Sequence, residues 1–104
     1  MLLTTTDTVP GRETASCLGL VKGSTVRAKH IGSDIVASLR NVVGGEVKEY
    51  ASLLTGAREQ AIDRMAEEAR KLGADAVVGM RLQTSAISQG ASEVVAYGTA
   101  VKLA

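Results

Sequence analysis

The sequence contains no phenylalanine and no tryptophan, and only two tyrosines among its 104 residues. A buried aromatic side chain usually contributes about 150–250 Å² to a core, whereas the 45% apolar content here is largely alanine and valine. A domain of this size buries only about 60–65% of the surface that its unfolded chain exposes. The core is therefore expected to be thin. Because a partner surface is the usual remedy at small size, we expect a homo-oligomer.

Cysteine, histidine and net charge are also scarce: one cysteine, one histidine and a formal charge of +1. A single cysteine cannot form an intramolecular disulfide, so nothing indicates a secreted, cross-linked domain. The basic residues are spread along the chain, so neither nucleic acid nor an anionic membrane is an expected partner. The N-terminus lacks the pattern of a signal peptide, and no run approaches the roughly 18 apolar residues of a membrane span. We expect a cytoplasmic protein.

Two strands are predicted in the first thirty residues. The segment "LLTTT" is short and rich in β-branched residues, and Pro10 and Gly11 then form a turn, as is typical of an edge strand. A second strand is predicted over 17–29. It contains Gly23, where we expect a bulge or a sharp bend.

Two helices follow. Ser33 can cap a short amphipathic helix that Gly44 and Gly45 would end. The second helix is predicted over 46–72, with Gly73 ending it; Gly56 inside it would permit close packing or mark a bend. Its apolar stripe has three-and-four spacing: Val47, Tyr50, Leu54, Ala57, Ala61, Met65, Ala69 and Leu72.

The chain finishes with two predicted strands, 75–85 and 92–103, joined by 86–91. In the last strand, Val95, Tyr97 and Val101 lie on one face, while Val94, Ala96 and Ala100 lie on the other. Both faces are apolar, but a single helix layer covers only one of them. The second face predicts contact with another subunit.

Several segments together resemble the YbjQ-like family of small bacterial and archaeal proteins: "VVGGE", "LGADAVVG" and "YGTAVK", within a similarity that runs over nearly the whole chain. The resemblance implies a single domain over 1–104 of the α+β class. In it, a small antiparallel sheet packs on one long and one short helix, and the subunits form a ring-like homopentamer. It implies no established activity. Members are often described as heavy-metal-binding domains, but no set of ligands comes with that description.

Cys17 and His30 are the candidate metal ligands. A thiolate and an imidazole suit zinc or copper, but a structural zinc site usually takes four protein ligands. Thirteen residues separate the two, which matches no familiar ligand spacing. We therefore interpret Cys17 as a small buried apolar residue and His30 as a polar residue before a helix, and predict no metal ligand. One alternative stays open: in a pentamer, a residue facing the axis would appear five times and form a ring of ligands.

Catalysis is the less favoured function. One histidine gives no Ser-His-Asp arrangement, and the chain has no phosphate loop or dinucleotide fingerprint, so neither a catalytic residue nor a cofactor is predicted. A pocket between subunits is favoured instead, because pockets often lie at such boundaries. Asp34, Arg40, Tyr50 and Arg58 are the candidate ligand-binding residues. The alternative, which the residue types alone favour, is that the four are caps and salt bridges that join the two helices and lock the interface. The sequence thus predicts a non-enzymatic binding or scaffold protein, with an enzyme acting at an inter-subunit site as the alternative.

Overall fold

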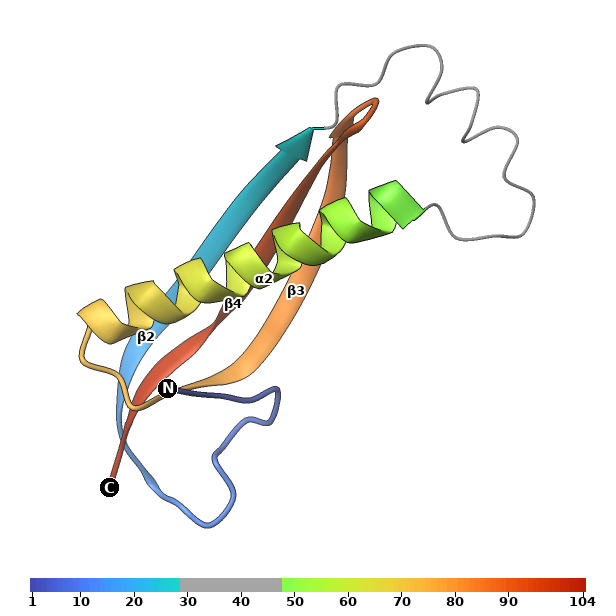
Figure 1. Cartoon of the computed structure of the whole chain (residues 1–104). Helices are drawn as coiled ribbons and strands as arrows, with labels where there is room; N and C mark the ends of the chain where they lie inside the picture. Colours follow the sequence, from blue (N-terminus) through green and yellow to red (C-terminus); the bar gives the residue numbers. More distant parts are fainter. Residues whose placement is uncertain (29–47) are drawn as a thin grey trace.

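The computed structural model describes residues 1–28 and 48–104, which form one helix and a four-stranded sheet (Figure 1). The elements in chain order are β1 (Leu2–Leu3), β2 (Thr14–Ala28), α2 (Lys48–Lys71), β3 (Ala76–Ser88) and β4 (Ala91–Leu103). The predicted α+β class is confirmed. The predicted short helix after Ser33 lies outside the described residues.

The strand order is β1-β3-β4-β2, so β4 lies inside the sheet between β3 and β2 (Figure 1). The β2–β4 and β3–β4 pairs are antiparallel, but β1 runs parallel to β3. The predicted all-antiparallel sheet is therefore wrong at β1, whereas its predicted edge position is correct. β1 is short because the Thr4 hydroxyl accepts a hydrogen bond from the Thr6 N–H (3.2 Å), a local turn that competes with strand pairing.

β3 and β4 extend through most of the segment 86–91 that was predicted as a loop. Only Gln89 and Gly90 lie between them, and Gly90 has φ 78°. A two-residue hairpin turn often needs such positive φ values, which glycine adopts without steric cost. The hairpin is thus longer and tighter than the sequence pattern predicts.

The end of α2 matches the prediction closely. Gly73 has φ 79°. Its N–H donates to the Arg70 carbonyl (2.9 Å), and the Ala74 N–H donates to the Ala69 carbonyl (3.1 Å). This pair of bonds is the Schellman arrangement that satisfies the last carbonyls of a helix.

α2 packs mainly on β2 and β4 and covers one face of the sheet, which we call the helix face. Its stripe of small and flexible residues meets the even-numbered residues of β4, and together they form the main core. That core consists of Val21, Ala57, Ala61, Met65, Ala69, Val77, Val94, Ala96 and Ala100. The predicted stripe is confirmed over 57–69. Leu72, in contrast, is 47% exposed, because the chain leaves the helix there and turns at Gly73.

Gly23 does not bend β2. The register with β4 is regular from Gly19 to Ala28, and the two irregularities lie earlier, between Thr14 and Ser16 and between Cys17 and Gly19. The predicted bulge at Gly23 is therefore wrong. The glycine is needed for a different reason: a Cβ there would lie 2.3 Å from the Ala61 carbonyl oxygen and from the Met65 nitrogen. At Gly23 the backbone of α2 therefore lies directly against β2.

The opposite side of the sheet, which we call the open face, is only partly covered. At its lower end, Val9 of the N-terminal segment packs with Ala76, Val78 and Val101 as a second, smaller core. At its upper end no described segment covers the apolar side chains, and Val26 is 55% exposed. Leu20, which is level with Val78 because both pair with Thr99, is 66% exposed.

Candidate functional site

The structure describes two of the four predicted ligand-binding residues, Tyr50 and Arg58. Asp34 and Arg40 lie outside the described residues, and Tyr50 is described only as part of the first turn of α2. Arg58 is exposed on α2, and its Nη2 donates to Thr55 Oγ1 (3.1 Å). This contact joins neighbouring turns of one helix. The convergence of the four residues on a ligand stays a prediction.

Cys17 lies in β2, opposite Val101 and next to an irregularity in the strand pairing. Its side chain is exposed, so the prediction of a buried, apolar cysteine is wrong. The irregular pairing at Cys17 and Gly19 is the physical reason, because a bulge changes the direction in which neighbouring side chains point. His30 lies outside the described residues.

A metal site needs several ligands within one coordination sphere. Within residues 1–28 and 48–104, no group of three or more His, Cys, Asp and Glu side chains is arranged to hold a metal ion. The residues described in one subunit therefore do not fit a heavy-metal centre.

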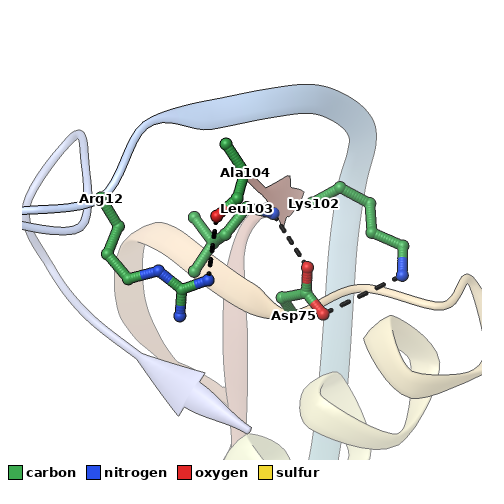
Figure 2. Close-up of polar contacts among 5 residues, drawn as sticks. All are labelled: Arg12, Asp75, Lys102, Leu103 and Ala104. Atoms are coloured by element: carbon green, nitrogen blue, oxygen red, sulfur yellow. Dashed lines mark hydrogen bonds and ion pairs between the residues drawn. The ribbon is translucent and has the colours of Figure 1, made fainter.

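Figure 2 shows a set of polar contacts at the end of the sheet where β4 finishes. Asp75 Oδ2 accepts from the Leu103 N–H (2.9 Å), and Asp75 Oδ1 lies 3.9 Å from Lys102 Nζ. Arg12 Nη2 donates to the Ala104 carbonyl (3.2 Å). All of these side chains are used to tie the N-terminal segment and the start of β3 to the end of β4. The role of these contacts is to stabilise the fold.

A hollow of about 490 Å³ lies along β2 and is our candidate for a binding site in the described chain. We call it the β2-edge groove; Lys22, Gly23, Ser24, Glu68, Glu93 and Val95 line it. Lys22, Glu68 and Glu93 thus contribute to its lining from β2, α2 and β4. The sequence pattern gave no sign of this, because Glu68 and Glu93 read as ordinary solvated residues of a helix and a strand.

Arg64 lies at the same edge. Its Nη1 donates to the Ser24 carbonyl (2.7 Å), which connects α2 to the outermost strand. Arg27 Nη2 makes a second such connection, to Gln60 Oε1 (3.0 Å). These two hydrogen bonds fix the position of α2 relative to β2, and with it the side of the groove that carries Glu68.

The comparisons with known proteins agree on a family. The YbjQ family, described as "Putative heavy-metal-binding", matches residues 1–104. The chain belongs to the YbjQ family. A UPF0145 protein of Halobacterium salinarum is 59% identical over 104 residues, which is 100% of both chains. UPF0145 proteins of Archaeoglobus fulgidus and Vibrio parahaemolyticus are 58% and 53% identical over 103 residues, covering 99% of this chain and 95% and 98% of theirs.

Among solved structures, a protein of unknown function from Pediococcus pentosaceus, described as a DUF74 family member, has a TM-score of 0.64 and 17% identity. The similarity covers 100% of this chain and 98% of that chain. It shows a shared fold. The resemblance that the sequence carried is thus confirmed at the level of the family and of the fold. In the described part of the chain, no helix combines the length and the apolar composition that crossing a membrane requires.

Proposed function

We propose that this chain is a cytoplasmic binding subunit that assembles as a homopentamer and holds a small polar ligand or a metal ion at the boundary between subunits. The β2-edge groove carries the proposal. It lies at the outer strand of the sheet and is lined by Lys22, Glu68 and Glu93, so both signs of charge are available to a ligand.

The position of the groove supports a shared site. β2 is an edge strand of the sheet, so a subunit placed beside β2 would lie next to the groove. Ligand sites bury most of the ligand surface, which a shallow groove on one subunit does not achieve. A neighbouring subunit would close it.

A binding function fits this chemistry better than catalysis does. A covalent catalyst needs a nucleophile within hydrogen-bond reach of a base. In the described residues, Cys17 is exposed on the strand and belongs to no group of three or more His, Cys, Asp and Glu side chains that could hold a metal ion. The groove offers charged groups that can bind, and no histidine is among its lining residues to activate the Ser24 hydroxyl.

A thermal-shift screen across metal ions, nucleotides and metabolites tests this function. A ligand that binds only the folded chain raises Tm in a concentration-dependent way. We expect Glu68→Gln and Glu93→Gln to remove that shift and Glu59→Gln, an exposed residue elsewhere on α2, to keep it. No shift with any compound, or a shift that both groove variants retain, would contradict the proposal; turnover of the identified ligand would make the chain an enzyme.

A further inference from the structure

One row of side chains on the open face places an aromatic ring between two cations. Tyr97 of β4 pairs with Lys22 of β2 on one side and with Arg81 of β3 on the other. Ala96 belongs to the core beneath α2, so the next residue, Tyr97, points to the open face. Residues directly opposite each other in antiparallel strands share a face. Lys22 and Arg81 therefore lie on the open face as well.

All three side chains of this row are exposed. Neighbouring strands of a sheet lie about 4.8 Å apart, so the backbones of Lys22 and Arg81 are roughly 10 Å apart, with the Tyr97 ring between them. Lysine and arginine side chains are long and flexible. Both cations can therefore reach one anion that is bound beside the ring.

The Arg81 guanidinium is held in place on its side of the ring. Its Nη1 donates to the Thr5 carbonyl (2.9 Å) and to the Met80 carbonyl (2.8 Å). A guanidinium has five N–H donors, so those on Nη2 and Nε can bind an anion while Nη1 anchors the group. In the part of the chain that the structure describes, no carboxylate forms an ion pair with Lys22 or Arg81. The charge of the row thus favours an anionic ligand.

The rows above Tyr97 carry groups of a different kind. Ser24 and Gln83 both pair with Val95, which gives a hydroxyl and an amide on either side of an apolar residue. Glu93 follows one row further on the same face, because it lies two residues from Val95 in β4. Four residues of a strand span roughly 13 Å. The open face thus has cations at one end and a carboxylate about 13 Å away.

The β2-edge groove is part of this surface. Its lining residues Lys22, Ser24, Glu93 and Val95 belong to the three rows, and Gly23 and Glu68 line the side nearer α2. Its volume of about 490 Å³ falls within the range of about 300–1,000 Å³ that is usual for small-molecule sites. The ring, the two cations and the hollow therefore form one site for a small molecule.

We propose that the ligand of this site is a nucleoside monophosphate whose base carries an amino group. The phosphate binds between Lys22 and Arg81 in charge-assisted hydrogen bonds. The base packs on Tyr97 and Val95, since aromatic rings stack on bases of any sequence, and its amino group donates to Glu93. The distance between the cations and the carboxylate is of the order of the length of such a molecule. This inference rests on the proposed function, because it names the ligand class of the same groove.

Three ligands test which parts of the molecule are recognised. Isothermal titration calorimetry of the full chain should detect binding of AMP. Ribose 5-phosphate, which lacks the base, and adenosine, which lacks the phosphate, should each bind at least about tenfold more weakly, because each loses one of the two ends. The affinity for AMP should also fall as salt is added, since both cations are exposed.

Variants of the ring test the stacking. Tyr97→Leu keeps an apolar side chain but removes the ring, so it should weaken AMP binding about tenfold. Tyr97→Phe keeps the ring and should keep the wild-type affinity. Neither change should alter the binding of ribose 5-phosphate by more than about twofold, because that ligand has no base to stack.

Variants of the charged groups test the two ends. Lys22→Met and Arg81→Met should each weaken AMP binding about tenfold, whereas Lys71→Met, which removes an exposed cation from the end of α2, should leave it unchanged. Glu93→Gln should weaken AMP binding about fivefold, the difference between a charged and a neutral hydrogen bond. It should not weaken the binding of ribose 5-phosphate.

Several outcomes would overturn the inference: no binding of AMP, equal binding of AMP and ribose 5-phosphate, or unchanged affinity in Tyr97→Leu. If AMP does not bind but another compound gives a thermal shift that Glu93→Gln removes, the proposed binding function stands and only the nucleotide is wrong. Light scattering shows whether each variant keeps the wild-type mass. Should Tyr97→Leu change the mass, the comparison of AMP with ribose 5-phosphate on the wild-type chain decides.

Discussion

Gly23 and Gly56 differ in the space that each would leave for a Cβ atom. A Cβ on Gly23 would meet backbone atoms of α2 at 2.3 Å, whereas the nearest atom to a Cβ on Gly56 is Arg27 Nη2 at 3.9 Å. We expect Gly23→Ala to lower the free energy of unfolding by about 3 kcal/mol, because backbone cannot move aside as a side chain can. Gly56→Ala should raise it by about 0.5–1 kcal/mol through helix propensity. Urea denaturation at one fixed protein concentration measures both; equal effects would contradict the close approach at Gly23.

Thr25 lies in the core and is 3% exposed, and its hydroxyl has no hydrogen-bond partner among residues 1–28 and 48–104. An unsatisfied buried hydroxyl costs about 1–3 kcal/mol. We expect Thr25→Val, which replaces the hydroxyl with a methyl group, to stabilise the fold by about 1 kcal/mol. Thr25→Ser keeps the hydroxyl and loses a methyl group, so it should destabilise the fold by about 1 kcal/mol. Loss of stability in both variants would show that the hydroxyl has a partner.

Cys17 is the only thiol of the chain and is exposed. Because the described residues supply no ligand cluster around it, we expect elemental analysis of protein purified without chelator to find no stoichiometric metal. About one zinc or copper per subunit, lost in Cys17→Ser or His30→Ala, would contradict this prediction. It would also favour a ring of ligands contributed by several subunits.

Among the elements, α2 has the most sharply defined end. Gly73 holds φ 79° in the Schellman arrangement, and an L-residue with a Cβ pays roughly 1–2 kcal/mol for that conformation. Gly73→Ala should lower the free energy of unfolding by that amount. Gly73→Asn should lower it by less, because asparagine tolerates the left-handed region. A thermal melt monitored at the helical circular-dichroism band gives the ranking, and an Ala variant as stable as the Asn variant would contradict it.

The elements that the sequence predicted well are those fixed by local chemistry. Periodicity and Gly73 located α2, and the apolar run over 92–103 located β4, because each signal lies within the element itself. The role of Gly23 depends on Ala61 and Met65, which lie far along the chain, so a local pattern could suggest only a bend. The parallel pairing of β1 is non-local in the same way. For the candidate site, the β2-edge groove joins three separate elements, and no spacing along the sequence marks such a set.

In the whole molecule, α2 covers one face of β4, and the other face is available to a neighbouring subunit. Val94 and Ala96 are fully buried beneath α2, so an aspartate there would test the core and not the assembly. Tyr97 lies on the open face and is 37% exposed. We expect Tyr97→Asp to lower the mass in solution while the chain still melts cooperatively. Val94→Asp should abolish the cooperative melt, since it buries a charge without a partner. An unchanged mass for Tyr97→Asp would exclude the open face from the interface.

The central position of β4 has a consequence for how the chain folds. β2 and β3 both pair with β4 and not with each other, and the register joins Thr14 to Leu103. The β3–β4 hairpin closes across two residues, and hairpins of this kind form in about 1–10 μs. β2, in contrast, cannot pair until β4 has emerged from the ribosome, because β4 is the last element of the chain. Pairing over such sequence separations slows folding toward the millisecond-to-second range. We therefore expect the hairpin to form first and the docking of β2 to limit the rate.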